Sequence, residues 1–189
     1  MQKRILKMTL CASLIVLSVV LSRFLFFVLP FTGEARYSLG WVPIYLAGFL
    51  LGPAWGAACG ALSDVIGYLI NPMGGAYFPG FTLSSAIAGF LPGLLFAMLK
   101  RHVPQPAERR SSQGFALLAL MYLILLPSQI VTSVLLKSLW FNLYYGLPFA
   151  AALPLNAISS AIILVVNGLL TWILYLIMVR QPAIRRLKE

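Results

Sequence analysis

The feature that most constrains the fold is a series of long apolar segments separated by short basic or Gly/Pro-rich stretches. Only 10% of the 189 residues are charged and 61% are hydrophobic, whereas a soluble domain has about a quarter of its residues charged. Because a membrane-spanning helix needs about 20 apolar residues, the sequence predicts an all-α integral membrane protein. We expect one domain over 1–189, a bundle of six transmembrane helices with spans at about 5–29, 39–52, 54–71, 82–100, 114–137 and 152–179.

Lysine and arginine predict the orientation, because cytoplasmic loops carry an excess of these residues. They gather at the N-terminus, between the fourth and fifth spans, and at the C-terminus: Lys3, Arg4, Lys7, Lys100, Arg101, Arg109, Arg110, Arg180, Arg185, Arg186 and Lys188. Both termini are therefore expected in the cytoplasm, and the loops 30–40, 72–81 and 138–151 outside. This topology accounts for the net charge of +10, so we expect membrane lipid and no nucleic acid as a partner.

One aspartate stands inside a predicted span. A buried carboxylate without a partner is expensive, so Asp64 needs a partner, a proton or a task. It is either a structural partner for Arg23 or for backbone groups, or a carboxylate that accepts paired N–H donors from a ligand. Arg23, in the outer part of the first span, either reaches the headgroups, pairs with Asp64, or faces an anionic ligand.

Aromatic residues cluster near the expected outer interface, where an aromatic belt is common. Tyr77, Phe78 and Phe81 differ from such a belt, because they lie in a Gly/Pro-rich loop that enters the fourth span at Thr82. A planar ligand could stack there.

Counting residues excludes most enzymes. The single histidine, His102, lies in the basic cytoplasmic loop, and Asp64 is the single aspartate, so no intramembrane protease site can be assembled. No Cys/His/carboxylate cluster suits a metal and no P-loop is present. We therefore expect a binding or transport protein without metal or cofactor, and not an enzyme.

Glycines repeat every four residues, at positions 48, 52, 56 and 60 and again at 89 and 93. Small residues at this spacing let helices approach closely.

Three blocks of sequence resemble a known family: "VLSRFL" (20–25), "GWVPIYLAGFLLGPAWGAACGALSDVIGYLINP" (40–72) and "GAYFPGFTLSSAIAGFLPGL" (75–94). The chain resembles the substrate-binding S components of energy-coupling factor (ECF) vitamin transporters, most closely the folate-specific group. The resemblance implies a bacterial cell-membrane protein that binds folate near its outer face under a lid formed by the loop between the first two helices. It also implies docking through the first helix onto a transmembrane T subunit that is driven by two ABC ATPases.

The resemblance gives the polar and aromatic residues candidate roles. The pterin ring of folate presents adjacent N–H donors, which match a carboxylate at Asp64. Trp41 or Tyr37 would close over the ring, and Arg23 or Arg36 would meet the glutamate tail. The candidate substrate-binding residues are Asp64, Arg23, Arg36, Tyr37, Trp41, Tyr68, Tyr77, Phe78, Phe81, Thr82, Gln129 and Asn156. The candidate docking residues are Thr9, Ala12, Ser13 and Val16, a departure from the alanines four apart that the family leads us to expect.

Three other functions remain open from sequence. The chain could be an S component for another vitamin, such as riboflavin, pantothenate or a queuosine precursor. It could be a stand-alone carrier in which Asp64 carries a proton, or a membrane assembly protein without a ligand.

Overall fold

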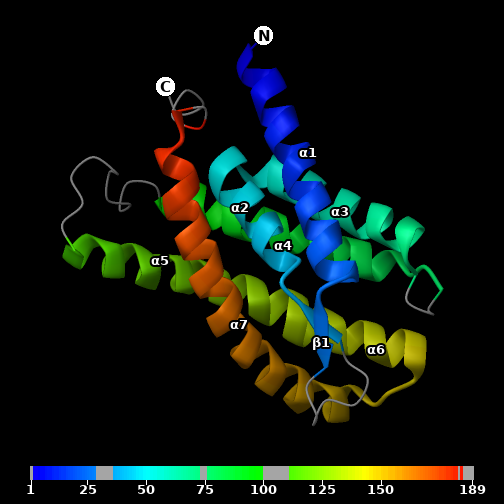
Figure 1. The fold of residues 1–189 in the computed structure, drawn as a ribbon. Helices are drawn as coiled ribbons and strands as arrows, with labels where there is room; N and C mark the ends of the chain where they lie inside the picture. The colour runs from blue at the N-terminus through cyan, green and yellow to red at the C-terminus, as the bar shows by residue number, and fades with distance from the viewer. Residues whose placement is uncertain (1, 29–35, 73–75, 100–110, 183, 185–189) are drawn as a thin grey trace.

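The computed structural model describes residues 2–28, 36–72, 76–99, 111–182 and 184. Helices dominate the described part of the chain, and a short two-stranded ribbon lies between α1 and α2 in sequence (Figure 1). In chain order the elements are α1 (Gln2–Arg23), β1 (Phe26–Val28), β2 (Arg36–Ser38), α2 (Trp41–Leu51), α3 (Pro53–Ile70), α4 (Pro79–Leu99), α5 (Ser111–Gln129), the π-helix η3 (Ile130–Leu136), α6 (Lys137–Tyr145) and α7 (Phe149–Arg180).

Four helical segments in the described part of the chain are long and apolar enough to cross a membrane. They are Lys3–Arg23, Pro79–Leu99, Phe115–Tyr144 and Phe149–Arg180, and Trp41–Leu51 is a shorter apolar helix. The structure therefore fits a membrane protein built of helices, while the count of six spans stays a prediction.

The first predicted span is wrong at its outer end, because helix α1 ends at Arg23 rather than near 29. Phe26–Val28 instead pairs antiparallel with Arg36–Ser38, so the fold is not purely helical. Two local preferences account for this. Aromatic and β-branched residues favour strands, and the proline at position 30 disfavours helix in the residue before it.

The prediction of an outer loop over 138–151 is also wrong. Helix α6 continues to Tyr145 and α7 begins at Phe149. The connection starts at Gly146, which has a left-handed φ of 69° and donates its N–H to the carbonyl of Asn142. Glycine adopts this conformation at low cost, so it ends the helix in a short turn.

The glycine repeats bring three helices together. Gly52, with a φ of 102°, separates α2 from α3. Pro53 then starts α3 at a position where no intrahelical N–H is needed. A Cβ on Gly48 would lie 2.6 Å from the carbonyl oxygen of Gly89 in α4, and a Cβ on Gly56 would collide with the same oxygen. The close helix packing expected from the sequence is confirmed between α2, α3 and α4.

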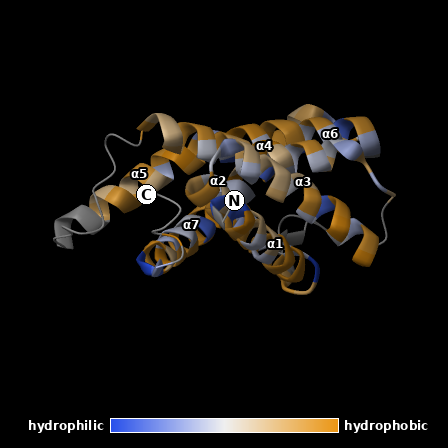
Figure 2. Cartoon of the chain, turned by 90° about the horizontal axis from the view of Figure 1, so that it is seen from above, coloured by the Kyte–Doolittle hydropathy of each residue, from blue (hydrophilic) through white to orange (hydrophobic). Residues whose placement is uncertain are grey.

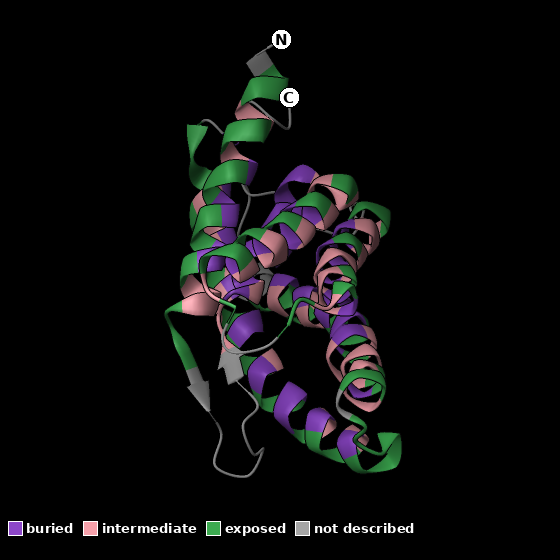
Figure 3. Ribbon diagram, turned by 90° about the vertical axis from the view of Figure 1, so that its right-hand side faces the viewer, coloured by how far each residue is buried: buried purple, intermediate pink, exposed green. Residues whose placement is uncertain are grey.

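The start of α1 and the end of α7 lie at the same end of the molecule, and the β ribbon lies at the other (Figure 1). Buried residues face the interior of the helix assembly, and exposed residues cover much of α1 (Figure 3). Apolar residues dominate the helices when the molecule is viewed from above (Figure 2). Many large apolar side chains are exposed, as expected where helices face lipid.

Candidate ligand-binding site

A cavity of ≈ 120 Å³ lies where the ribbon joins the helices. Its walls come from α1, from the end of β2 and the turn that follows it, and from α2, α3 and α4. Three of the sequence candidates line it: Arg23 at the end of α1, Trp41 at the start of α2 and Asp64 in α3. The structure thus brings together residues that are separated by tens of positions in the chain.

Arg23 and Asp64 form an ion pair in the wall of this cavity. The Nη2 atom of Arg23 lies 3.6 Å from Oδ1 of Asp64, and the two side chains are only 14% and 20% exposed. The guanidinium also donates to two backbone carbonyls, from Nη1 to Asn71 at 3.2 Å and from Nη2 to Asp64 at 3.4 Å. Arg23 therefore ties the C-terminal end of α1 to α3, and the sequence hypothesis that pairs it with Asp64 agrees with this geometry.

The second carboxylate oxygen of Asp64 accepts a hydrogen bond from α4. Thr82 Oγ1 donates to Oδ2 at 2.6 Å, and the Tyr77 hydroxyl lies 2.8 Å from Thr82 Oγ1. Because threonine has a single hydroxyl proton, which goes to Asp64, Tyr77 is the donor to Thr82. The Tyr68 ring lies 5.2 Å from the Tyr77 ring. Four candidates from α3 and the α4 entry thus form one network with Arg23.

Phe78 and Phe81 belong to a separate aromatic cluster with α6. The centroid of the Phe78 ring lies 5.6 Å from that of Phe81, 5.5 Å from that of Trp140 and 5.3 Å from that of Tyr144. Trp140 Nε1 donates to Ser84 Oγ at 2.8 Å, which fixes α6 against α4. These rings meet tilted or edge to face, so they pack on one another and form no parallel slot for a planar ligand.

Gln129 and Asn156 are buried elsewhere in the interior. Gln129 Oε1 accepts from the Tyr45 hydroxyl at 2.7 Å, and Asn156 Nδ2 donates to Ser138 Oγ at 2.9 Å. Neither lines the cavity of ≈ 120 Å³. The backbones of Arg36 and Tyr37 belong to β2, but their side chains lie outside the described part of the structure.

Sequence reasoning did not select the small residues that complete the cavity wall. Ser18 Oγ donates to the carbonyl oxygen of Gly40 at 2.8 Å, and a Cβ on Gly40 would lie 2.7 Å from the Cβ of Ser22. The useful signal was the spacing of Ser18 and Ser22, four residues apart and hence on one face of α1. Other small or apolar lining residues are Ser38, Ile44, Ser63 and Ser85.

The four candidate docking residues share one exposed face of α1. Thr9 Oγ1 donates to the carbonyl of Ile5 at 3.1 Å, and Ser13 Oγ donates to that of Thr9 at 3.0 Å. These hydroxyls are bonded to their own helix, so with Ala12 and Val16 they leave a smooth face of small side chains. Within the described residues, no group of three or more His, Cys, Asp or Glu side chains is placed to hold a metal ion.

Comparison with known proteins gives three similarities. The family model for the substrate-specific component of ECF transporters matches residues 6–180. The folate transporter FolT of Clostridium novyi (strain NT) is 38% identical over 94 residues, which cover 50% of this chain and 52% of that protein, so the match spans about half of this relative. A crystal structure of FolT bound with folic acid superposes with a TM-score of 0.66 and 28% identity, covering 89% of this chain and 93% of that chain.

Proposed function

Since the chain belongs to the substrate-specific components of ECF transporters, we propose that its ligand is folate, captured at the outer face of a bacterial cell membrane. The main support for folate is the structural similarity, over 89% of the chain, to a FolT whose crystal structure contains folic acid. The 38% identity to a folate transporter over half the chain supports the same ligand. Its family consists of transporter binding components, so the chain acts as a transport subunit and not as an enzyme.

The proposed orientation has both termini in the cytoplasm and the ribbon outside. Support comes from the basic residues at the two ends of the chain and from the arrangement of α1 and α7, whose terminal ends lie together (Figure 1). In this orientation the cavity beside the ribbon faces the side from which the vitamin arrives, and the ribbon is the lid.

In the proposed complex, Asp64 accepts N–H donors from the pterin edge while Arg23 holds the carboxylate in place. A carboxylate has about four lone-pair sites, so contacts with Arg23 and Thr82 leave acceptor capacity for a ligand. Trp41, in the cavity wall, flanks the ring. The cavity of ≈ 120 Å³ is smaller than the roughly 300–1,000 Å³ typical of sites for ligands of drug size. The rest of the folate molecule therefore extends beyond it, with movement of the ribbon.

Inward delivery of folate requires partners that hydrolyse ATP. We propose that the exposed face of α1 with Thr9, Ala12, Ser13 and Val16 docks on a T subunit, which is coupled to two ABC ATPases. Close approach of a partner helix is favoured by small side chains of this kind. A stand-alone proton carrier predicts instead that uptake persists without the ATPases and stops in Asp64→Asn.

The first test is thermal unfolding of the detergent-purified protein, stripped of bound ligand, with folate and with riboflavin as control. A ligand at 1,000 times its Kd adds about 4 kcal/mol to stability, which raises the melting temperature clearly. We expect a shift with folate alone. A shift with riboflavin alone would retain the family and replace the ligand, and no shift with either ligand would contradict the proposal.

A further inference from the structure

Two residues that the sequence selected for ligand binding lie outside the cavity wall. Thr82, near the start of α4, and Tyr77, just before α4, are not among the residues that line the cavity of ≈ 120 Å³. Thr82 instead reaches the wall through Asp64, to which its hydroxyl donates a hydrogen bond. The two hydroxyls therefore stand behind the carboxylate of the proposed site rather than in front of it.

The hydroxyls form a directed relay that ends on one oxygen of the carboxylate. Tyr77 donates to Thr82 Oγ1 at 2.8 Å, and Thr82 Oγ1 donates to Oδ2 of Asp64 at 2.6 Å. The other oxygen, Oδ1, lies 3.6 Å from Nη2 of Arg23. The χ2 torsion of an aspartate is broad by itself, so these contacts from α4 and α1 fix the plane of the carboxylate. Hydrogen bonds in such a chain also polarise one another and become stronger.

The far end of the relay is held by aromatic packing. The Tyr77 ring lies 5.2 Å from the ring of Tyr68, which follows Asp64 by one helical turn in α3. The helix that carries the carboxylate therefore also places the phenol. Because Tyr77 is 42% exposed, removal of its hydroxyl should change the relay with little effect on the packed interior.

A fixed carboxylate plane matters most for a ligand with two adjacent N–H donors. Such a pair binds a carboxylate through two parallel hydrogen bonds, and this geometry requires the donors and acceptors to share a plane. A ligand with a single donor can follow a carboxylate that rotates, whereas a ligand with two donors loses one bond when the plane turns. The 2-amino group and the neighbouring ring N–H of a pterin are such a pair.

We propose that Thr82 and Tyr77 orient Asp64 without touching the ligand, and that this orientation gives the site its preference for ligands with two adjacent N–H donors. The inference rests on the proposed function, because the pterin is the proposed source of the donor pair. Thr82 is the positioning residue that contacts the carboxylate. Tyr77 keeps the Thr82 proton directed at Asp64, since its own proton occupies a lone pair of Thr82 Oγ1.

The test is equilibrium binding of folate and of 2-desaminofolate, which lacks the 2-amino donor, to the purified full chain and to three variants. Thr82→Val keeps the shape of the side chain and removes its hydroxyl. Its folate affinity should fall about 10-fold, while the affinity for 2-desaminofolate should fall by about 2-fold at most. Thr82→Ser keeps the hydroxyl and should retain most of the preference for folate. Tyr77→Phe keeps the ring against Tyr68 and should lower folate affinity about 3-fold, with 2-desaminofolate again affected less.

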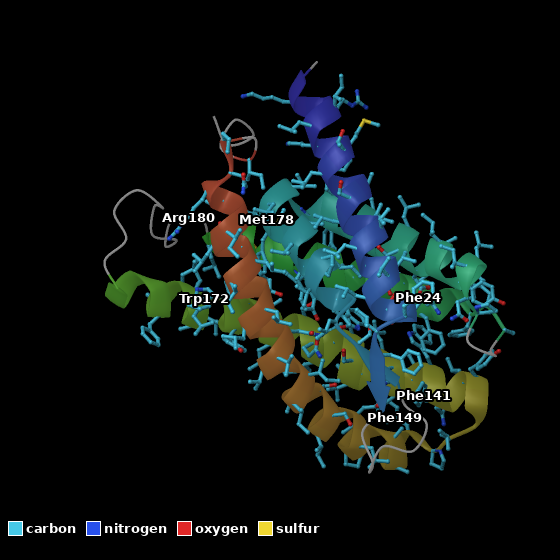
Figure 4. All side chains as sticks on the ribbon, in the orientation of Figure 1. Phe24, Phe141, Phe149, Trp172, Met178 and Arg180 are labelled. Carbon is cyan, nitrogen blue, oxygen red and sulfur yellow. The ribbon has the colours of Figure 1, made fainter. Side chains whose placement is uncertain are left out.

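A matched control removes an equivalent hydroxyl away from the cavity. Thr171→Val deletes a donor at the same distance of 2.6 Å, in this case to the carbonyl of Asn167 within α7. Its neighbour in the chain, Trp172, lies well apart from Phe24, the residue that follows Arg23 (Figure 4). Both affinities should stay unchanged in Thr171→Val.

An equal loss of affinity for both ligands in Thr82→Val would overturn the inference, since it would indicate a packing role. Unchanged folate affinity in that variant would overturn it as well. If Thr82→Val does not fold, Tyr77→Phe decides, because an unchanged ratio of the two affinities in that variant refutes the relay. Wild-type protein that binds neither ligand refutes the proposed function itself, which separates the two failures.

Discussion

Replacing Asp64 by Asn removes one charge from a largely buried pair while keeping the shape of the side chain. The amide oxygen can still accept from Thr82, which donates to Asp64 at 2.6 Å. Arg23 is left as an uncompensated cation that is 14% exposed. Two losses follow for separate reasons: the ligand-free protein loses stability, and the folate complex loses the proposed contact with the pterin edge.

The loss of stability and the loss of folate affinity have different physical origins, so their sizes are worked out separately. Breaking a buried pair by removing one partner costs about 3–5 kcal/mol. The 3.6 Å separation, the partial exposure and the two carbonyl contacts that Arg23 keeps reduce this to about 2–3 kcal/mol of stability. A lost hydrogen bond to a charged group costs about 1.5–3 kcal/mol of folate affinity, a roughly 10- to 100-fold rise in Kd.

A double-mutant cycle separates the two losses. Arg23→Gln, Asp64→Asn and the double variant are compared by thermal unfolding without ligand and by equilibrium folate binding. The double variant should regain part of its stability, because neither unpaired charge remains. Its folate affinity should stay as low as that of Asp64→Asn. Recovery of affinity together with stability, or unchanged affinity in a folded Asp64→Asn, would refute the role of the carboxylate in binding folate.

Three further predictions concern packing, docking and the lid. Gly89→Ala would place a Cβ against the carbonyl oxygen of Gly56 and should lower the free energy of unfolding by about 1–3 kcal/mol, seen as a lower melting temperature. Gly146→Asn is the control: Gly146 has a left-handed φ and open space around it, so the melting temperature should change little. Val16→Trp, on the proposed docking face, should prevent copurification with the T subunit and ATPases while leaving the folate-induced thermal shift intact. Gly40→Ala should push the ribbon away from α1 and speed folate release, measured by dissociation kinetics.

The sequence predicted the helix contacts that depend on local spacing. Glycines four residues apart had to lie on one helix face, and α3 and α4 do meet backbone to backbone at Gly56 and Gly89. The glycine contacts follow from residue type and spacing, without knowledge of how distant helices cross. The ligand-stacking role expected for the loop before Thr82 stays a prediction, although Thr82 itself donates to Asp64.

Other features depend on tertiary geometry that spacing does not encode. Pairing of Arg23 with Asp64 requires α1 and α3 to place these two residues at the same level along the helix bundle, and the sequence left that pairing open. The π-helix before Lys137 arises from backbone hydrogen-bond register, for which residue periodicity gives no signal. Ser18 and Ser22 of the cavity wall have no distinguishing sequence pattern, because their role depends on the approach of Gly40 to α1 in the folded chain.

The residues that flank the ribbon on its two sides contact different helices. Arg23, just before β1, contacts Asp64 and Asn71 of the α3 end, and Gly40, just after β2, accepts a hydrogen bond from Ser18 of α1. If the ribbon acts as the proposed lid, its movement would therefore arise between these two contacts, next to the cavity. A well-packed apolar pair would join α1 to α3 with similar or greater stability. Stability alone thus does not account for a carboxylate in this wall, whereas the proposed ligand with its paired N–H donors would.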